Sequence, residues 1–477
     1  MTIHAQSQSE REIIQRVHEA GQEHVFRFLN ELSSASRRQL FDQLESIDWQ
    51  MLSQLYRDFI HSPGSHSISG ELEPAEVIPI PNSKEQMQAA HAAKLTGEAG
   101  LRQGRVAAFL VAGGQGTRLG FSGPKGLFPV SPVKQKSLFQ LHAEKIKAAS
   151  RRYGTTIPWY IMTSETNHEE TANFFATHEF FGLNAEDIIF FSQDMVPALD
   201  PRGKLILDAK DHIFTNPNGH GGSLLSLKKS GALQDMRRRG IDLIFYFQVD
   251  NVLVKMCDPV FLGYHIRQGA QMSAKVVSKT DPQEKVGVVG RIDGRLGVIE
   301  YSDLSDAEKQ ARNPDGSLKF AAGNIAIHVL DVAFVEQENQ GGLRLPWHVA
   351  HKKVPYLDEH GHRIEPEEPN GYKFEAFVFD ALGDAESAVI LEVKREEEFS
   401  PVKNARGVDS PETARQDMSN LFGTWLEKAG VAVPRDAENN VVGNVEVSPL
   451  FALDEEEFLQ KTTSGLRFTE NLYLEYT

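Results

Sequence analysis

The sequence has almost no cysteine, no long apolar run and no excess of basic residues. Its 477 residues include one cysteine, Cys257, which excludes a disulfide within the chain and a cysteine-rich zinc site. No apolar stretch approaches the roughly 20 residues of a membrane-spanning helix, and the first ten residues are polar, unlike a signal peptide. The formal net charge of −16 disfavours a nucleic-acid-binding face. We therefore expect a cytoplasmic protein, monomeric, that binds neither nucleic acid nor membrane.

The composition is that of an ordinary globular protein, with 40% hydrophobic and 24% charged residues. This balance excludes wholesale disorder, and the length allows two or three domains. We predict a mostly helical N-terminal domain over residues 1–98, a central α/β domain over residues 99–391, and a small C-terminal α/β domain over residues 392–477.

The N-terminal range carries apolar residues at helical spacing between residues 10 and 60. Ser34 or Ser36 could cap the second of these helices. Residues 61–82 contain several prolines and glycines and predict an extended connector.

From residue 106 onward, strand-like and helical segments alternate, which indicates parallel strands joined by crossover helices. Two β-rich runs around Asp293-Gly294 depart from this pattern and predict an antiparallel hairpin beside the parallel sheet. The predicted fold class is therefore α/β with a mixed sheet. The strands are expected over residues 106–110, 158–163, 188–191 and 241–249, the hairpin over 286–301, and helices over 83–100, 165–181 and 413–426.

The most informative segment is the glycine-rich stretch over residues 110–120, which directly follows the first predicted strand. Glycines let backbone amides approach a phosphate or a base without obstruction by Cβ atoms. Arg118 and Lys125 add two cations of the kind that hold a triphosphate. The segment fits neither the dinucleotide G-x-G-x-x-G fingerprint nor the P-loop pattern. A glycine-rich turn with only a steric role would not need the two cations, so we predict nucleotide binding.

Asp250 and Asn251 close the strand expected at residues 241–249. In open α/β sheets, ligands bind beyond the carboxyl ends of the strands. A carboxylate there is suited to hold Mg²⁺ together with phosphate oxygens. Asp250 could equally cap a helix, and the two roles are compatible.

A second glycine-rich loop covers residues 216–222 and precedes a predicted helix at Ser223. It is either a mobile surface turn or a place where backbone passes close to a flat ligand such as uracil or a sugar ring. His220 within it could be a hydrogen-bonding or a structural residue. Glu300 and Asn324 are polar residues in otherwise apolar runs, and they suit sugar hydroxyls, although such residues are commonly structural.

Taken in order, these segments resemble the eukaryotic-type UDP-N-acetylhexosamine pyrophosphorylases and the related UDP-sugar pyrophosphorylases. The motif L-x-x-G-G-x-G-T-x-L-G followed by Pro124-Lys125 carries much of the resemblance. The resemblance implies a Rossmann-like nucleotidyltransferase sheet of the glycosyltransferase-A type, with the central range as the catalytic domain. The matching segments are residues 110–125, 193–197, 216–222, 249–251, 282–290, 322–324, 348–355, 374–380 and 398–404.

The resemblance also implies a role for each matched position. Uracil would be recognised by Leu110, Gly113, Gly114, Gln193, Gly219 and His220. The catalytic cations that hold the phosphates would be Arg118, Lys125 and Lys403. The sugar would contact Gly287, Glu300 and Asn324, and Asp250 would bind the Mg²⁺ cofactor.

The implied reaction converts UTP and a sugar 1-phosphate, expected to be N-acetylglucosamine 1-phosphate, into a UDP-sugar and pyrophosphate. His220 stands where N-acetylglucosamine enzymes carry asparagine and is closer to the UDP-glucose and broad-specificity branches. A UDP-glucose or UDP-galactose pyrophosphorylase, or a broad-specificity UDP-sugar pyrophosphorylase, is therefore the alternative. A glycosyltransferase is disfavoured because Asp250-Asn251-Val252 lacks a D-x-D motif. A non-catalytic UDP-sugar-binding protein is the third possibility.

Overall fold

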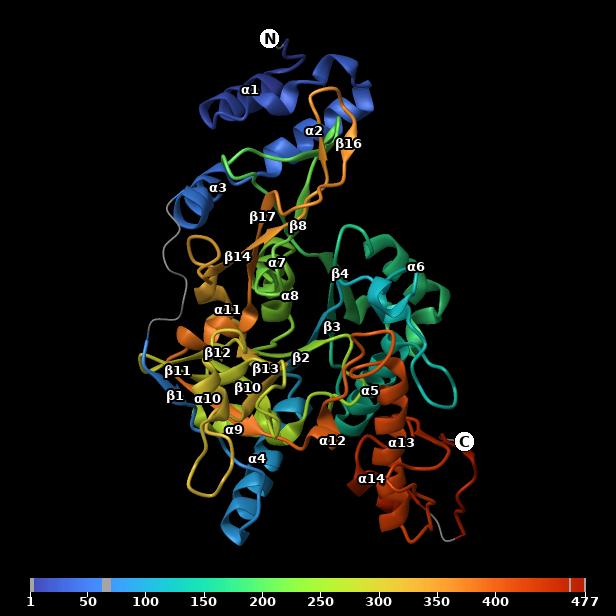
Figure 1. The fold of residues 1–477 in the computed structure, drawn as a ribbon. Helices are drawn as coiled ribbons and strands as arrows, with labels where there is room; N and C mark the ends of the chain where they lie inside the picture. The colour runs from blue at the N-terminus through green and yellow to red at the C-terminus, as the bar shows by residue number, and fades with distance from the viewer. Residues whose placement is uncertain (1–3, 62–69, 463–464, 476–477) are drawn as a thin grey trace. The chain divides into compact units, whose positions relative to one another are not determined.

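The computed structural model describes residues 4–61, 70–462 and 465–475 (Figure 1). These residues form two compact units. Unit 1 combines Met1–Ile68, Asp194–Gly222 and Leu345–Val378, and unit 2 combines Ser69–Gln193, Ser223–Arg344 and Phe379–Thr477. The three consecutive domain ranges expected from the sequence stay a prediction.

Unit 2 is built on a ten-stranded mixed sheet whose main path runs β1-β11-β13-β9-β2-β3-β4. Strands β9 (Leu243–Gln248), β2 (Val106–Val111), β3 (Trp159–Thr163) and β4 (Ile188–Ser192) pair in parallel. They are the four strands predicted from the alternating pattern. Helix α5 (Leu138–Tyr153) connects β2 to β3, as expected for a crossover connection.

The other half of the sheet is antiparallel except for one pair. It contains β13 (Ala322–Asp331), β11 (Val288–Ile292), β1 (Leu72–Pro74), β12 (Arg295–Ile299), β10 (Met272–Ser278) and β18 (Ala388–Glu392), of which only β10 and β18 pair in parallel. Strands β11 and β12 form the predicted hairpin. Its turn residues Asp293 and Gly294 have φ values of 49° and 79°, which a two-residue turn of this kind requires.

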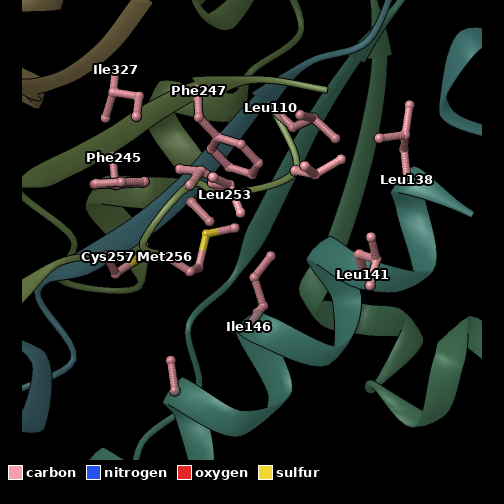
Figure 2. Packing of buried hydrophobic residues seen from close by; sticks show 14 of the residues in the cluster. Leu110, Leu138, Leu141, Ile146, Phe245, Phe247, Leu253, Met256, Cys257 and Ile327 are labelled. Atoms are coloured by element: carbon pink, nitrogen blue, oxygen red, sulfur yellow. The ribbon is translucent and has the colours of Figure 1, made fainter. Parts of the chain in front are cut away.

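The core of unit 2 lies between the sheet and its covering helices. Figure 2 shows Leu138, Leu141 and Ile146 of α5 on the side of the sheet where Leu110 and Phe247 project. Each of these five side chains is at most 2% exposed. Because β2 and β9 are flanked by strands on both edges and covered on their faces, they read as nearly continuous apolar runs.

The remaining helices of unit 2 surround this sheet. They are α4 (Lys84–Arg102), α6 (His168–Thr177), α7 (Gly222–Lys229, whose first residue belongs to unit 1), α8 (Ala232–Arg238), α9 (Pro259–Gln268), α10 (Asp306–Gln310), α11 (Val332–Glu338), α12 (Arg395–Glu398), α13 (Pro411–Lys428) and α14 (Glu455–Lys461). The predicted helices at residues 83–100 and 413–426 correspond to α4 and α13.

The helix predicted over residues 165–181 is shorter than expected. Helix α6 ends at Thr177, and Glu179, Phe180 and Phe181 have positive φ values between 50° and 54°. An α-helix cannot continue through this left-handed backbone. The turn places the ring of Phe181 edge-on against Phe175, with centroids 5.3 Å apart, so tertiary packing overrides the local helical pattern.

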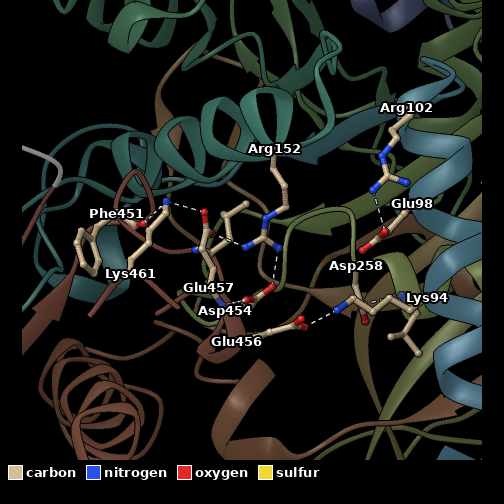
Figure 3. A network of polar contacts seen from close by, with 12 residues as sticks. Lys94, Glu98, Arg102, Arg152, Asp258, Phe451, Asp454, Glu456, Glu457 and Lys461 are labelled. Carbon is tan, nitrogen blue, oxygen red and sulfur yellow. Dashed lines mark hydrogen bonds and ion pairs between the residues drawn. The ribbon is translucent and has the colours of Figure 1, made fainter. Parts of the chain in front are cut away.

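The C-terminal residues of unit 2 are attached to the sheet region through ion pairs (Figure 3). Arg152 of α5 binds Asp454 at 2.6 Å and also binds Glu457. Lys94 of α4 pairs with Glu456 at 2.5 Å. Strands β19 (Asn444–Val447) and β20 (Asn471–Leu474) pair in parallel, and β19 packs against α13.

Unit 1 contains helices α1 (Gln8–Glu19), α2 (Ser34–Ser46) and α3 (Trp49–Leu55), with 3-10 turns at Glu23–Phe26 and Leu29–Glu31. Helix α2 is capped by Ser33, whose Oγ accepts a hydrogen bond from the N–H of Ser36 at 3.1 Å. The predicted cap at Ser34 or Ser36 is therefore wrong by at least one residue. Three neighbouring serines compete for the position, and local sequence alone does not distinguish them.

Short strands complete unit 1, and the helices pack on them through one apolar cluster that includes Val17, Leu40, Phe41 and Phe374. The strands are β5 (Met195–Pro197), β6 (Leu207–Ala209), β7 (His212–Ile213), β8 (Thr215–Pro217), β14 (Trp347–Lys352), β15 (Tyr356–Leu357), β16 (Arg363–Ile364) and β17 (Gly371–Ala376). Strands β14 and β17 pair antiparallel over six residues each.

The connector expected at residues 61–82 is partly outside the described residues, which exclude 62–69. Its second half is extended, as predicted, but it also joins the sheet. Residues 72–74 form β1, and the N–H of Ile78 donates to the carbonyl of Ile390 at 2.8 Å. Within residues 4–61, 70–462 and 465–475, no helix has both the length and the apolar character needed to cross a membrane.

Candidate active site

The glycine-rich loop follows β2 at the carboxyl edge of the parallel strands and is held by hydrogen bonds to its own backbone. The N–H of Lys125 donates to the carbonyl of Gly114 at 3.0 Å, and the N–H of Gly116 donates to that of Gly123 at 2.9 Å. The side chain of Asn167 donates to the carbonyls of Ala112 at 3.0 Å and Gly114 at 3.4 Å. Sequence reasoning missed Asn167, because nothing near it in the chain indicates that it lies against this loop.

Gly113 and Gln193 lie in contact, although 80 residues separate them in the sequence. A Cβ atom built on Gly113 would lie 2.6 Å from Nε2 of Gln193, so a side chain at position 113 would require the end of the glutamine to shift. The backbone N–H of Gln193 donates to the carbonyl of Thr163 at 2.8 Å, which fixes Gln193 just beyond β4. Two residues expected to recognise uracil are thus brought together.

The other predicted residues of this loop differ in exposure. Leu110 lies inside β2, paired with β3 and β9, and its side chain belongs to the core. Gly114 is exposed, and a Cβ atom there would meet nothing within 4 Å. Arg118 is exposed on the short 3-10 turn Thr117–Leu119 and forms no ion pair with the part of the chain that the structure describes. Its guanidinium is therefore available to a ligand.

Lys125 and Asp250 form an ion pair, with Nζ 3.1 Å from Oδ2 and side chains 17% and 11% exposed. The alternative in which Asp250 caps a helix is wrong, because the next helix, α9, is capped by Asp258. In the described ranges, no three His, Cys, Asp or Glu side chains gather to hold a metal. Asp250 thus offers a single carboxylate, which fits an Mg²⁺ ion that takes its other ligands from phosphates and water.

The backbone around Asp250 is bonded to residues 398–402. The N–H of Val402 donates to the carbonyl of Asp250 at 3.0 Å, and the N–H of Val252 donates to that of Ser400 at 3.2 Å. Lys403 directly follows this pairing. Its side chain is 44% exposed, with Nζ 3.6 Å from Oδ2 of Asp409. The structure therefore brings the segment of Lys403 to that of Asp250.

Helix α5 supports the loop after β9 through one buried and one partly buried side chain, both of which sequence reasoning missed. His142 Nε2 lies 3.0 Å from the carbonyl oxygen of Val249, and Lys145 Nζ donates to the carbonyls of Val252 and Val254 at 2.6 Å and 3.0 Å. Burial lowers the pKa of His142 to about 3 and that of Lys145 to about 7. The two residues are three positions apart, so their side chains project from the same face of the helix. Both can therefore bind carbonyl groups of the same loop.

The three residues predicted to contact the sugar lie together in unit 2. The N–H of Asn324 donates to the carbonyl of Gly287 at 2.9 Å. A Cβ atom on Gly287 would lie 3.4 Å from Oε1 of Glu300. Oδ1 of Asn324 also accepts from the N–H of Ala326 at 3.1 Å, which orients the amide. The start of β11, the end of β12 and the start of β13 thus gather a glycine, a carboxylate and an amide, and a Cβ atom on that glycine would lie 2.7 Å from Cγ1 of Val298.

The second glycine-rich loop is part of unit 1 and is packed against the end of β17. A Cβ atom on Gly219 would lie 2.3 Å from the carbonyl oxygen of Ala376, and one on Gly221 would lie 2.6 Å from its carbonyl carbon. The N–H of Gly221 donates to that oxygen at 2.8 Å. These two glycines are therefore explained by close approach to backbone, and the interpretation as a mobile surface turn is wrong.

His220 has both ring and hydrogen-bond partners in unit 1. Its ring stacks on Phe377, with centroids 5.1 Å apart and an interplanar angle of 25°, and the N–H of Val378 donates to its Nδ1 at 3.1 Å. Phe377 also contacts His348, with centroids 4.4 Å apart. Burial, together with the like charge of His348, lowers the pKa of His220 to about 4. His220 is therefore neutral near pH 7, with its proton on Nε2.

One Ser-His-Asp arrangement occurs among the described residues of unit 2, but its serine and histidine are buried, and only its aspartate, Asp331, reaches solvent. Nδ1 of His265 lies 2.8 Å from Oγ of Ser273, and its Nε2 lies 3.3 Å from Oδ1 of Asp331. Ser273 is fully buried on β10 and His265 is 1% exposed. A substrate carbonyl cannot reach this serine, so the cluster is structural and does not indicate a hydrolase.

A comparison with known proteins identifies the family. The model of the UTP–glucose-1-phosphate uridylyltransferase family matches residues 50–436. The chain belongs to this family. The predicted family and nucleotidyltransferase fold are thereby confirmed, whereas the roles of the individual site residues stay predictions.

Relatives and a solved structure extend the match over most of the chain. The human UDP-N-acetylhexosamine pyrophosphorylase-like protein 1 is 41% identical over 88% of this chain and 86% of its own length. The Saccharomyces cerevisiae UDP-N-acetylglucosamine pyrophosphorylase is 37% identical over 87% of this chain and 91% of its own. The Trypanosoma brucei uridine diphosphate N-acetylglucosamine pyrophosphorylase, solved with an inhibitor, superposes with a TM-score of 0.81 at 28% identity, covering 96% of this chain and 95% of that one.

Proposed function

We propose that this protein transfers the uridylyl group of UTP to N-acetylglucosamine 1-phosphate and releases pyrophosphate. The observation that carries the proposal is the 37% identity to the yeast enzyme named for this product, which extends over most of both chains. The fold and the grouping of Lys125 with Asp250, and of Gly287 with Glu300 and Asn324, support it.

In the proposed reaction, an anionic oxygen of the sugar phosphate attacks the α-phosphorus of UTP. A new P–O bond forms, and the bond between the α-phosphorus and the bridging oxygen breaks, so that pyrophosphate leaves with the electron pair. The attacking oxygen is already deprotonated near neutral pH, so no general base is needed. The reaction therefore needs no nucleophilic side chain activated by a neighbouring general base. Among the side chains described above, none forms such an arrangement that a substrate could reach.

The difficulty of the reaction is to bring two polyanions together and align them in line. Lys125 is largely buried beside Asp250, with a side chain 17% exposed, whereas Arg118 and Lys403 are exposed enough to close on a substrate. We assign these three cations to the phosphates. Asp250 would hold Mg²⁺, which supplies charge neutralisation and alignment of the phosphate oxygens.

Recognition of the two substrates is assigned to separate groups of residues. Gln193, with the backbone of Leu110, Gly113 and Gly114 and the loop at Gly219 and His220, would bind uracil. Gly287, Glu300 and Asn324 would bind the sugar hydroxyls. The Gly113–Gln193 contact supports the first group, because it orients an amide that can both donate to and accept from a base edge.

A UDP-glucose or UDP-galactose pyrophosphorylase is the second candidate, and one observation favours it. His220 is a bulky ring fixed by Phe377 and Val378 at the position where a smaller asparagine is expected for an N-acetyl sugar.

We further propose that the protein is a monomer and that it is located in the cytoplasm. Its single cysteine, which is free and buried, suits the reducing conditions of that compartment. Light scattering after size exclusion would measure the oligomeric state.

The test is pyrophosphate release from UTP and Mg²⁺ with the 1-phosphates of N-acetylglucosamine, N-acetylgalactosamine, glucose and galactose. Preference for N-acetylglucosamine 1-phosphate supports the proposal. Preference for glucose 1-phosphate or galactose 1-phosphate would reject N-acetylglucosamine 1-phosphate as the substrate and support the second candidate function. Absence of turnover with all four, together with intact binding of UDP-sugar, would make the protein a binding protein and overturn the enzymatic assignment.

A further inference from the structure

Asn251 is the residue through which the segments of Asp250 and Lys403 are joined. It is 3% exposed, and its amide faces the turn at residues 398–400. Nδ2 donates to the carbonyl of Glu398 at 2.7 Å, and Oδ1 accepts from the N–H of Ser400 at 3.0 Å. Oδ1 also accepts from the N–H of Leu253 at 3.2 Å. The side chain of Asn251 thus bonds to the backbone of its own segment and to that of residues 398–400. We call the contact between residues 250–253 and 398–402 the junction.

The position of Lys403 depends on this junction, because its own side-chain contacts are weak. An ion pair at 3.6 Å with a half-exposed lysine contributes little to fixing a geometry. The backbone holds Lys403 more firmly: its own N–H donates to the carbonyl of Asp409 at 2.7 Å, and the N–H of the preceding Val402 donates to the carbonyl of Asp250 at 3.0 Å. Of these two bonds, the one from Val402 ties Lys403 to the segment of Asp250. The bond from Val402 to Asp250 forms only if residues 398–402 lie in register with residues 250–252, and the side chain of Asn251 bonds to the backbone of both segments.

The far side of the junction is itself anchored by a buried ion cluster. Lys275 of β10 is fully buried, and its Nζ donates to Oε2 of Glu398 at 2.5 Å and to Oδ2 of Asp258 at 2.6 Å. Removing one partner of such a cluster is costly because a buried charge is left uncompensated. The carbonyl that Asn251 binds therefore belongs to a residue that is fixed to the sheet.

We propose that Asn251 is a positioning residue that fixes Lys403 relative to Asp250. The inference rests on the proposed function, which gives Asp250 and Lys403 their roles at the phosphates. Asn251 itself is buried against backbone and does not touch substrate in this assignment. Its effect on turnover passes through Lys403, whereas a merely structural asparagine would act independently of that lysine.

A double-mutant cycle on the full-length protein separates the two possibilities. Asn251→Ala in the wild-type background is expected to lower kcat by about 100-fold. The reason is that a displacement of about 1 Å of a group aligned with the reacting atoms can reduce the rate by this factor. In a Lys403→Met background, the same substitution is expected to lower kcat by less than about threefold, since the group it positions is already absent. Equal losses in the two backgrounds would overturn the proposal.

Asn370 provides a matched control in unit 1. Its Oδ1 accepts from the N–H of Val354 at 2.7 Å, and its Nδ2 donates to the carbonyl of the same residue at 2.9 Å. Asn370→Ala removes the same kind of contact but is expected to change kcat equally with and without Lys403. If Asn251→Ala does not fold, Asn251→Ser keeps an acceptor but is too short to reach Glu398, and the same cycle applies. The wild-type assay keeps the inference separate from the proposed function: absence of turnover rejects the function, whereas turnover with an additive cycle rejects only the role of Asn251.

Discussion

Nζ of Lys125 lies 3.1 Å from Oδ2 of Asp250, so a proposed phosphate-binding cation and a proposed metal-binding carboxylate neutralise each other. A divalent cation at Asp250 must compete with this ammonium, and a phosphate that attracts Lys125 releases the carboxylate. If both residues have their proposed roles, we expect the pair to couple the two binding events and to favour uptake of the cation together with the nucleotide.

The first prediction is that Lys125→Met raises the affinity for Mn²⁺ in the absence of nucleotide while lowering turnover by about 100-fold or more. The substitution removes the competing charge beside Asp250 and also removes a cation from the phosphates. Electron paramagnetic resonance of Mn²⁺ measures the first effect, and pyrophosphate release measures the second. Lys403→Met, which does not contact Asp250, should reduce turnover without raising the affinity for Mn²⁺. Unchanged Mn²⁺ binding in Lys125→Met would contradict the coupling.

Local patterns predicted much of this site, because its parts are contiguous in sequence. The glycine-rich loop with Lys125, the end of β9 at Asp250, and the hairpin turn at Asp293-Gly294 each carry their own signal within one short contiguous stretch of sequence. The predicted strands agree with β2, β3, β4 and β9 for the same reason. A parallel sheet then brings the carboxyl ends of such strands to one edge, so the neighbourhood of the loop and Asp250 follows from the fold class.

The contacts that could not be predicted join distant segments. Asn251 and Glu398 are separated by 147 positions, and Asn167 reaches the glycine-rich loop from 53 positions away. Asn167 belongs to no pattern that a single sequence displays. Asn251 lies in the motif at residues 249–251, but the motif does not indicate which distant backbone its amide binds. The positive φ values after α6 are a similar case, since the packing of Phe181 decides them.

The contact between Gly113 and Gln193 gives a second prediction. Gly113→Ala places a methyl group 2.6 Å from Nε2 of Gln193, so the glutamine must move. We expect KM for UTP to rise by about tenfold or more, because a displaced amide leaves a base edge unpaired. Gly297→Ala is a suitable control, since a Cβ atom there meets only a methyl group of Ile292 at 3.8 Å. An unchanged KM for UTP in Gly113→Ala would remove Gln193 from the uracil site.

His220→Asn tests the choice between sugars. Asparagine Oδ1 can replace His220 Nδ1 as the acceptor for the N–H of Val378, but the stacking on Phe377 is lost. We expect a loss of stability of about 0.5–1.5 kcal/mol and a higher ratio of turnover with N-acetylglucosamine 1-phosphate to turnover with glucose 1-phosphate. Kinetics with both sugars measure the ratio, and a ratio unchanged by the substitution would show that His220 does not select the sugar. Because burial lowers the pKa of His220 to about 4, this histidine should add no inflection to the activity between pH 6 and 8.

Glu338, at the end of α11, gives a prediction about stability and pH. Its carboxyl is fully buried, and burial, with a contribution from Asp384, raises its pKa to about 7, although Arg344 lies 3.9 Å away. Between its unfolded pKa near 4.5 and pH 7, the folded protein binds more protons than the unfolded chain. The free energy of unfolding therefore falls as the pH rises through this window. Above pH 7 the loss of stability caused by ionising the buried carboxyl has reached its full size.

Glu338→Gln removes that cost, because glutamine has the shape of the protonated acid and does not ionise. We expect the variant to be more stable than the wild type by about 1–3 kcal/mol at pH 8 and nearly equal to it at pH 4.5. Denaturant unfolding at the two pH values measures the difference. Glu336→Gln on the same helix is the control: Glu336 pairs with Arg237, its pKa is lowered by that partner, and its loss should destabilise the protein at pH 8. A Glu338→Gln variant that is less stable than the wild type at pH 8 would mean that the buried carboxylate is ionised and favourably paired, and that Arg344 outweighs burial.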